Sequence, residues 1–530
     1  MNKGQKKTSE SAGKFFNHPS LPELMSALPQ EYDKTLRKVW ETFFTISLDC
    51  PRPSGGEEKI RKFLLWYGEE MYRNNVIAEE DLEGNILWKL PASSQSFDNP
   101  EKSILFTAHM DMVCFPAADN PESPARKGVI PEVIKPANGA WYVQSKGQKT
   151  TLGADNGAML AVMAQLPELL KNKQHGRIGL LFTSSEETTM KGARGIGFNL
   201  DDYKYAINLD RSKENCIDIG ATGTQETSII LPVNHIPSHP IQLFLQINGL
   251  RGGHSGNDMH DPTRQSALKI TAKILDEFKN KGANFNIISL KSNGPMNAIP
   301  AAAETTIAVN HTRQRMLYEI ITKTIESIQK EEKNLTITCE KASLNNTMLD
   351  NDSSTRLLDL LNIFPHGVLN WGKNINGQYP KTSINLAQVL FSPDQKEVQI
   401  KLKSRSFYKS ALTELGKKLK ETAQKYKAIA EYSSLIPVWQ ARQNTSLSKI
   451  VREAYKEVTH GKQMEERMAP STLEPSYLIH NYQQFDGNTV AIGPNIKDEH
   501  TKTERVEGES LEKIVKVVIK TIQKIAILSG

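Results

Sequence analysis

The sequence predicts an α/β protein with a second, α+β domain inserted into the first. Up to about residue 220, short apolar runs such as 104–107 and 178–182 alternate with amphipathic helical segments. This alternation, with short connections, is typical of a largely parallel, mixed sheet flanked by helices. Between about 221 and 436 the order changes to strand-strand-helix-strand-strand-helix, which indicates an antiparallel sheet with helices on one side.

The same patterns predict the limits of the domains. Residues 1–20 are rich in Lys, Ser and Gly, so we expect a disordered lead-in. The first domain then comprises 21–220 and 437–530, and the insertion comprises 221–436. An insertion of about 215 residues is too long to be a loop.

Each element follows from its local pattern. The run 104–107 is apolar on both faces, as in a buried strand, whereas 227–233 and 241–247 alternate, as in a half-exposed sheet. Amphipathic spacing predicts helices, and Pro and Gly at 51–56 separate the first two. Expected helices are 32–46, 57–74, 158–170, 261–279, 313–331, 354–363, 412–426 and one ending the chain, with apolar residues from Leu511 to Ile525; expected strands are 85–90, 104–107, 177–182, 205–209, 227–233, 241–247, 286–290, 305–309, 335–340, 382–390, 397–402 and 489–493, and 126–151 is loop and hairpin.

Composition excludes several classes of protein. The net charge of +6 is small for 530 residues, and the lysines are spread over helix faces, so we expect no nucleic-acid partner. No run approaches the ~20 apolar residues that span a bilayer, so we expect no membrane partner. The cysteines have no paired spacing, which favours a reducing compartment, and we expect the cytoplasm. They are Cys50, Cys114, Cys216 and Cys339.

Acidic and imidazole side chains follow the ends of several predicted strands. The strand at 104–107 leads into a His-x-Asp, and a Glu-Glu pair, an Asp and a Glu-His pair follow 177–182, 205–209 and 489–493. A further Asp precedes the helix at 158–170. A single His-x-Asp is usually a structural pair, but ligands collect at the carboxyl edge of such sheets, so five placements indicate one shared site. The set is His109, Asp111, Asp155, Glu186, Glu187, Asp210 and His500.

These side chains suit two divalent cations. Two imidazoles and five carboxylates without a thiolate favour Zn²⁺, Mn²⁺ or Co²⁺. Five carboxylates could not remain charged together in a dry cleft without cations. Asp111, two residues after His109, is placed to orient that imidazole. Of the pair Glu186 and Glu187, one can bind metal while the other transfers protons.

The motifs that carry these residues resemble the M20 family of dinuclear metallopeptidases, and most closely its aminoacyl-histidine dipeptidase branch. The motifs are His109-Met110-Asp111, Gly153-Ala154-Asp155-Asn156-Gly157, Ser185-Glu186-Glu187, Asn208-Leu209-Asp210 and His500. The resemblance extends from about Ser20 to the C-terminus. It implies a catalytic domain of the zinc-exopeptidase type and two metal ions, expected to be Zn²⁺.

The resemblance also implies roles for these residues. His109 and Asp210 are expected to hold one metal, Glu187 and His500 the other, and Asp155 to bridge them. Asp111 orients His109, and Glu186 acts as general base and acid for a metal-bound hydroxide.

The insertion resembles the family's lid domain, which predicts substrate-binding residues. The segment 248–256 resembles the motif whose histidine meets the substrate carbonyl, and an arginine at 405 suits a substrate carboxylate. Expected substrate-binding residues are His254, Asn297, Asn385, Arg405 and Glu474. The chain departs from the family at Met296, at 470–476 and at 501–503, where the ends of a substrate would be recognised.

The expected function is hydrolysis of short unblocked peptides, including Xaa-His dipeptides, by a dinuclear metal-dependent dipeptidase. The expected partner is a small peptide, and the chain is a monomer or a homodimer formed through the lid. Two alternatives remain. One is an M20-type hydrolase of another amide, such as a tripeptide, an N-acyl amino acid or cysteinylglycine. The other is a binding protein that retains the metals without catalysis.

Overall fold

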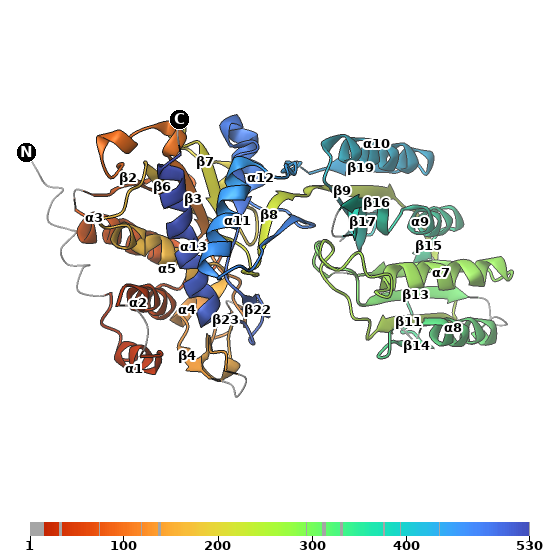
Figure 1. Cartoon of the computed structure of the whole chain (residues 1–530). Helices are drawn as coiled ribbons and strands as arrows, with labels where there is room; N and C mark the ends of the chain where they lie inside the picture. The colour runs from red at the N-terminus through yellow and green to blue at the C-terminus, as the bar shows by residue number, and fades with distance from the viewer. Residues whose placement is uncertain are drawn as a thin grey trace, which may run out of the picture. The chain divides into compact units, whose positions relative to one another are not determined.

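The chain forms two compact units (Figure 1). The structure, a computed structural model, describes residues 15–30, 34–73, 75–117, 119–135, 139–292, 294–309, 314–328, 332–374, 377–392, 394–433 and 435–528. Unit 1 comprises Met1–Gly220, Ala441–Met468 and Glu474–Gly530; unit 2 comprises Ala221–Gln440 and Ala469–Leu473.

Some parts of the expected division differ from these units. Residues 437–440 and the segment Ala469–Leu473, expected in the second part of the first domain, belong to unit 2. The N–H of Thr222 donates to the Ala469 carbonyl at 3.2 Å, and the hydroxyls of Thr224 and Thr472 are 2.5 Å apart. Most of the expected lead-in, residues 1–14, lies outside the described residues. At its end, Phe15 packs on Phe63 with ring centroids 5.0 Å apart, because an apolar side chain there finds a partner on unit 1.

Unit 1 contains a smaller four-stranded sheet, β22-β23-β5-β4, and a large mixed sheet with helices packed on it. Its eight strands are ordered β1-β2-β6-β3-β7-β21-β8-β20. The neighbours β6-β3, β3-β7 and β7-β21 are parallel, whereas β1-β2, β2-β6 and β21-β8 are antiparallel. Its elements are α1 Leu21–Ala27, α2 Lys34–Asp49, α3 Glu58–Met71, β1 Ile77–Glu80, β2 Ile86–Leu90, η1 Gln95–Phe97, η2 Pro100–Lys102, β3 Ile104–His109, α4 Pro124–Lys127, β4 Pro131–Ile134, β5 Tyr142–Ser145, η3 Lys146–Gln148, α5 Ala154–Leu169, β6 Ile178–Thr183, α6 Lys191–Arg194, β7 Tyr205–Asn208, β8 Cys216–Ala221, α11 Ser446–Val458, β20 Glu465–Ala469, α12 Pro475–Asn481, η4 Gln483–Phe485, β21 Thr489–Ala491, β22 Ile496–Lys497, β23 Arg505–Glu507 and α13 Gly508–Ala526.

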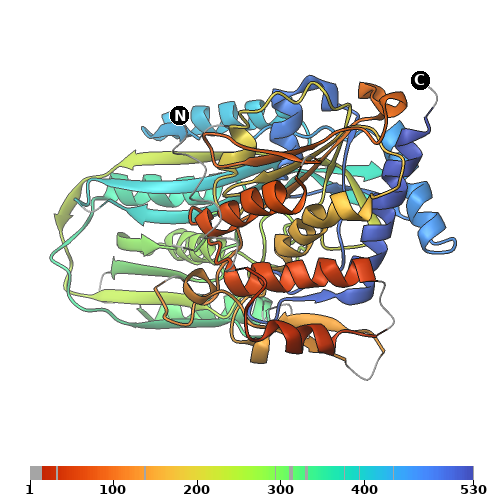
Figure 2. The same ribbon diagram turned by 90° about the vertical axis from the view of Figure 1, so that its left-hand side faces the viewer.

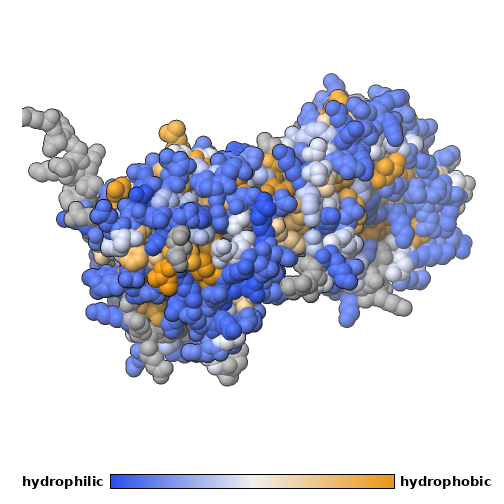
Figure 3. All heavy atoms as spheres, turned by 45° about the horizontal axis from the view of Figure 1, so that its top comes forward, coloured by the Kyte–Doolittle hydropathy of each residue, from blue (hydrophilic) through white to orange (hydrophobic). Residues whose placement is uncertain are grey.

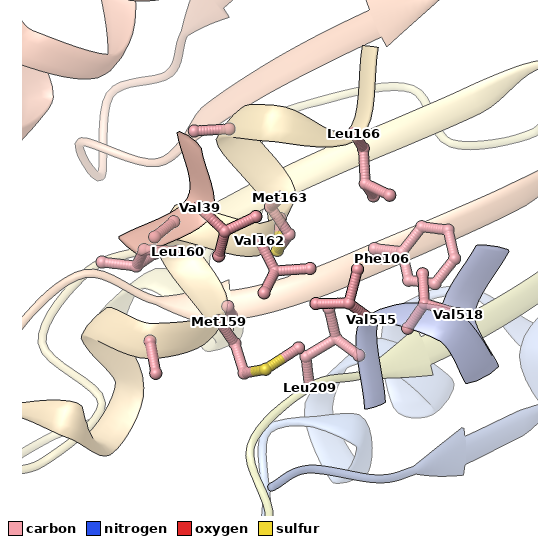
Figure 4. Close-up of a cluster of buried hydrophobic side chains, with 14 of the residues drawn as sticks. Val39, Phe106, Met159, Leu160, Val162, Met163, Leu166, Leu209, Val515 and Val518 are labelled. Carbon is pink, nitrogen blue, oxygen red and sulfur yellow. The ribbon is translucent and has the colours of Figure 1, made fainter. Parts of the chain in front are cut away.

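The core of unit 1 explains why α5 is apolar on all sides. This helix contacts α2, α3, α13 and β3, so it is covered all round and nearly every residue is buried. Figure 4 shows Met159, Val162 and Leu166 of α5 against Phe106 of β3 and Val515 of α13. A helix that is apolar on all sides belongs in a core. The packing around α5 therefore holds its first turn in a fixed place.

Unit 2 contains two larger antiparallel sheets, ordered β12-β13-β11-β14 and β16-β17-β18-β9-β19, and a two-stranded antiparallel sheet, β10-β15. They are seen in Figure 2 among the yellow-green to cyan strands. Helices α7 to α10 pack on these strands. Its elements are β9 Gly223–Pro232, β10 His235–Pro237, β11 Gln242–Asn248, α7 Ala267–Asn280, β12 Phe285–Lys291, β13 Ala303–Val309, α8 Gln314–Ile328, β14 Thr336–Lys341, β15 Thr347–Leu349, α9 Asn351–Ile363, β16 Gly367–Asn374, β17 Gly377–Phe391, β18 Glu397–Ser406, α10 Lys409–Lys425 and β19 Ile429–Tyr432.

The face shown in Figure 3 is mostly hydrophilic, and smaller apolar areas are scattered among the hydrophilic ones. None of the described helices combines the length and the apolar character that crossing a bilayer requires.

Candidate metal centre

The ends of four neighbouring strands bring the predicted site residues to one edge of the unit 1 sheet. His109, the last residue of β3, pairs with Thr183 at the end of β6, and Thr107 pairs with Asn208 at the end of β7. Asn208 in turn pairs with Ala491, the end of β21. The polar residues that follow these strands therefore emerge together, as expected at the carboxyl edge of a parallel sheet.

Asp155 reaches the same edge from the start of α5. The residue before the helix, Gly153, adopts a left-handed conformation (φ 70°), which glycine adopts without steric cost. The sequence predicted a helix from 158. The element α5 begins at Ala154, but Asp155 and Asn156 have non-helical backbone angles, so Asp155 lies in a kinked turn directly before the regular helix.

The two imidazoles lie on either side of the Asp155 carboxylate. His109 Nε2 is 3.0 Å from Asp155 Oδ1, and His500 Nε2 is 3.1 Å from Asp155 Oδ2. Asp210 Oδ1 lies 3.7 Å from His109 Nε2, and Glu187 Oε1 lies 3.0 Å from His500 Nε2. One carboxylate that offers an oxygen to each of two imidazole groups is suited to bridge two cations.

The site contains two sets of potential metal ligands, and within each set the ligand atoms lie within 4.8 Å of one another. One consists of His109, Glu186 and Asp210, and the other of His109, Asp155 and Glu187. Both sets share His109, so the two candidate positions adjoin. Histidine and carboxylate donors without a thiolate suit Zn²⁺, Mn²⁺ or Co²⁺.

Asp111 holds both His109 and the glutamate pair. One carboxylate oxygen lies 3.3 Å from His109 Nδ1, which leaves Nε2 facing the other carboxylates. The same carboxylate accepts the backbone N–H groups of Glu186 at 2.9 Å and Glu187 at 3.1 Å. Although burial raises the pKa of Asp111, these contacts lower it below its ordinary value, so the carboxylate stays charged.

The glutamate pair and the imidazoles show that the site favours cations. Burial raises the pKa of Glu186 well above its ordinary value, and Asp210 and Glu187 raise it further against the lowering by His109. Burial lowers the pKa of His500, but the neighbouring carboxylates of Asp155 and Glu187 raise it. Without cations, the carboxylates thus depend on protons for charge balance.

Glu187 provides a separate test of fit for a metal. Its Oε1 atom is buried and accepts no aligned hydrogen bond from any described residue, although His500 Nε2 lies 3.0 Å away. A buried oxygen and an imidazole nitrogen that lie so close without forming a hydrogen bond are suited to share a cation. These residues therefore fit a divalent metal.

Four further residues support this site, and the sequence analysis did not single them out. Ser54 Oγ donates to Asp111 Oδ2 at 2.6 Å, and Glu57 accepts the N–H of Ser185 at 3.0 Å. The other two, Arg52 and Glu504, are buried beside the Asp155 turn. The Pro and Gly residues at 51–56 predict only a connection between helices. Contacts to backbone groups leave no residue pattern, so the burial of the Pro-Arg-Pro segment could not be predicted.

Glu474 is a buried carboxylate at the start of α12 in unit 1. Its Oε2 accepts a hydrogen bond from the Thr183 hydroxyl at 2.9 Å, while Oε1 has no partner among the described residues. Burial raises the pKa of Glu474 to about 8, against the lowering by His109. Because Thr183 pairs with His109 across β6 and β3, Glu474 lies near the candidate metal ligands.

His254 lies in a turn of unit 2 that determines its tautomer. Its Nδ1 accepts the N–H groups of Gly256 at 3.3 Å and Asn257 at 3.1 Å. Because Nδ1 accepts, the proton of the neutral ring resides on Nε2. The N–H of His254 itself donates to Asp258 at 2.7 Å, so the ring is a fixed hydrogen-bond donor.

The other predicted substrate-binding residues of unit 2 surround this turn. The Asn297 carbonyl accepts the N–H of Ser255 at 2.7 Å, and Asn385 donates to the Ala298 carbonyl at 2.7 Å. Arg405 of β18 is buried, with Nη2 3.3 Å from the Ser255 hydroxyl. Unit 2 thus brings His254, Asn297, Asn385 and Arg405 together.

Comparisons with known proteins identify the family of this chain. Residues 152–524 match the model of a family described as Peptidase family M20/M25/M40. The matched part includes Asp155, Glu186, Glu187, Asp210 and His500, and begins after His109.

Several relatives match nearly the whole chain. The cytosol non-specific dipeptidase of Escherichia coli (strain K12) is 28% identical over 488 residues, which cover 89% of this chain and 94% of that protein. The crystal structure of an aminoacylhistidine dipeptidase from Vibrio alginolyticus is similar in fold, with a TM-score of 0.72, 24% identity, and coverage of 94% of this chain and 98% of that one. A tripeptidase from Staphylococcus aureus subsp. aureus Mu50 has a TM-score of 0.53 at 16% identity, with coverage of 93% and 99%.

The family match covers more than half of the chain, and the similar folds extend over the remainder. The resemblance expected from the sequence motifs is therefore confirmed: the protein is a metallopeptidase that belongs to peptidase family M20/M25/M40.

Proposed function

We propose that this metallopeptidase is a dinuclear dipeptidase that cleaves short peptides with both ends free, with Xaa-His dipeptides among its substrates. The observation that carries the proposal is the position of Asp155, with one oxygen near each of two imidazoles. The similarity to proteins named as dipeptidases supports the substrate class.

The metal-binding roles follow from the distances within unit 1. His109 and Asp210 would hold one divalent ion, Glu187 and His500 the second, and Asp155 would bind both; Zn²⁺ is the ion we propose. When bound, such ions polarise a scissile carbonyl and activate water as a nucleophile.

Glu186 is the residue we propose for proton transfer. Burial, together with Asp210 and Glu187, raises the pKa of its carboxyl group, which suits a group that accepts a proton from water and later gives it to the leaving amine. The hydrogen bond from its N–H to Asp111 fixes the backbone that carries this carboxyl group. Asp111 thereby positions both His109 and Glu186.

The preference for a free carboxyl end rests on Arg405. Its guanidinium is buried, and no described residue places a carboxylate within ion-pair distance of it. The Ser255 hydroxyl at 3.3 Å is a weak partner, and burial lowers the pKa of Arg405 to about 10. A buried cation of this kind is stabilised by an anion, and a substrate carboxylate has the bidentate geometry that arginine matches.

Two further residues are candidates for substrate contacts. Glu474, with one unpartnered buried oxygen, is our candidate for the free amine of the substrate, and the fixed Nε2–H of His254 is a candidate donor to its carbonyl. We also propose the cytoplasm as the location, since all four cysteines are free.

A panel of peptides tests the substrate class. We expect the metal-loaded protein to cleave Xaa-His, Xaa-Gly and Xaa-Leu dipeptides, and to cleave their N-acetylated and C-amidated forms poorly, because each blocked end removes a charge that needs a buried partner. Equal turnover of N-acetylated peptides would favour an acylase, and absence of turnover with both metals bound would favour a binding protein.

The variant Arg405→Met sharpens the same panel. It should raise KM for free dipeptides and remove the difference between free and C-amidated forms. Lys403→Met is the matched control, because Lys403 lies two residues earlier on β18 and is paired with Glu226 at 3.0 Å. An unchanged preference for free carboxyl ends in Arg405→Met would exclude this arginine as the carboxylate-binding residue.

A further inference from the structure

Arg52 joins two segments that carry the proposed metal ligands. It lies between α2 and α3, and its side chain is buried, with the residue only 1% exposed. The guanidinium donates to the carbonyls of Met110 at 3.0 Å and Asp111 at 2.8 Å through Nη1, and to the carbonyl of Gly153 through Nη2. The first two carbonyls follow His109, and the third precedes Asp155.

The surroundings of Arg52 are complementary to a guanidinium. A Cβ atom at Gly153 or at Gly157 would collide with Nη2 of Arg52, so the glycines on both sides of Asp155 make room for this side chain. The backbone carbonyl of Arg52 accepts the N–H of Met112 at 3.0 Å. Arg52 is therefore held on both sides, through its backbone and through its side chain.

Glu504 holds the Asp155 turn through the opposite set of backbone groups. Its carboxylate accepts the N–H groups of Leu152 and Gly153, both at 2.9 Å, and of Asp155 at 3.1 Å. It is 2% exposed. In this turn, the Gly153 carbonyl thus accepts a hydrogen bond from Arg52, and the backbone N–H groups donate to Glu504.

We propose that Arg52 and Glu504 are positioning residues that hold the Asp155 turn at a fixed separation from the His109 segment, and so allow two metal ions to share the Asp155 carboxylate. The inference deepens the proposed function and rests on it. Neither residue is expected to touch a metal or a substrate.

The chemistry of arginine explains why this position needs it. A planar guanidinium offers five donors in a rigid fork, so it can bind carbonyls of two separate segments at once. A lysine ammonium is a flexible point charge without this geometry. Burial lowers the pKa of Arg52, and the nearby Glu504 and Asp111 act against this lowering.

The test compares Arg52→Lys and Glu504→Gln with the wild type and with Arg37→Lys. Arg37 is a matched control, because it also donates to two backbone carbonyls, those of Met25 and Pro29, but neither belongs to a ligand-bearing segment. The affinity of each metal-free protein for a first and a second Zn²⁺ is measured by competition with a chromophoric chelator. Electron paramagnetic resonance of the Mn²⁺-loaded proteins reports whether two ions are coupled.

We expect two bound ions in the wild type and in Arg37→Lys. In Arg52→Lys and Glu504→Gln, the dissociation constant of the second ion should rise by about 10- to 100-fold, the range typical of residues that orient metal ligands. The Mn²⁺ spectrum of these variants should contain an uncoupled six-line signal. Far-ultraviolet circular dichroism checks that each variant is folded.

The outcomes separate this inference from the proposed function. A wild type that binds fewer than two ions overturns the proposed dinuclear site itself. A wild type that binds two ions, with second-ion affinity unchanged in a folded Arg52→Lys or Glu504→Gln, overturns only the positioning role. If Arg52→Lys does not fold, Glu504→Gln decides the result, and loss of folding in both variants assigns these residues to the fold and overturns the inference.

Discussion

Glu186 and Glu187 are adjacent in the chain but differ in their neighbours. Glu187 Oε1 lies 3.0 Å from His500 Nε2, whereas Glu186 belongs to the set with His109 and Asp210. We predict that Glu186→Gln lowers kcat by at least ~10²-fold, the lower range for a general acid–base group, while both metals remain bound. Glu187→Gln should instead lose one metal.

Metal content by inductively coupled plasma mass spectrometry, together with kcat on a cleaved dipeptide, distinguishes the two variants. Each serves as the control for the other, because both replace a carboxylate with an amide of the same size at neighbouring positions. The reverse pair of phenotypes would show that the proposed roles are exchanged.

Buried glutamates also predict how stability depends on pH. Burial raises the pKa of Glu474 to about 8 and that of Glu504 to about 7, from an ordinary value of 4.5. Between pH 4.5 and about pH 8, these carboxyl groups therefore hold more protons in the folded, metal-free protein than in the unfolded chain. The free energy of unfolding consequently decreases as the pH rises through this range.

Urea unfolding of the chelator-treated protein at pH 5.5 and pH 8 measures this effect. We expect lower stability at pH 8, and a smaller difference between the two pH values in Glu474→Gln, which cannot ionise. An identical pH dependence in this variant would mean that Glu474 does not carry a raised pKa in solution.

At the residue scale, the proposed metal ligands are easier to predict from the sequence than the residues that position them. His109, Asp155 and Glu187 stand out because five predicted strand or helix ends all carry His, Asp or Glu, a combination that indicates one shared site. Arg52 and Glu504 act on backbone carbonyl and N–H groups, whose positions depend on the fold and not on a local pattern of residues. Their contribution could be recognised only in three dimensions.

At the element scale, we expect the contact between the segments that follow β7 and β21 to control the separation of two proposed ligands, Asp210 and His500. Gly493 follows β21, and a Cβ atom there would collide with the backbone of Arg211, the residue after Asp210. We predict that Gly493→Ala forces these two segments apart, destabilises unit 1 by about 1–3 kcal/mol as other overpacked sites do, and weakens metal binding.

Urea unfolding and Zn²⁺ titration measure these two effects. Gly294→Ala provides the control, because a Cβ atom at Gly294 meets no atom within 4 Å and the change should leave both measurements unaltered. If Gly493→Ala behaves like Gly294→Ala, the strand ends tolerate separation and this contact does not determine the site.

Most elements could be predicted because their patterns are strong. The helix expected at 412–426 is α10, Lys409–Lys425, and the strand expected at 397–402 is the longer β18, Glu397–Ser406. The strand β16, Gly367–Asn374, was missed. Its residues include Gly and Asn, which are rare in strands, and its pairing with β17 comes from the fold and not from propensity.

At the scale of the whole molecule, each unit has a hydrophobic core of its own. One cluster of buried apolar residues lies between Leu21 and Ile219 and between Leu447 and Ile525, and another lies between Ile229 and Ala428. All proposed metal ligands belong to unit 1. Metal binding should therefore stabilise one core and leave the other unaffected.

We predict two calorimetric unfolding transitions, of which only one depends on metal. A ligand that binds only the folded state at 100 times its dissociation constant stabilises it by about 2.7 kcal/mol per site, so Zn²⁺ should raise the unfolding temperature of unit 1, and a chelator should lower it and abolish activity. In His109→Ala, which removes the imidazole shared by both ligand sets, the metal-dependent shift should disappear or shrink. Equal shifts of both transitions with Zn²⁺ would show that the units unfold together, whereas no shift at all in a metal-loaded protein would contradict the proposed site.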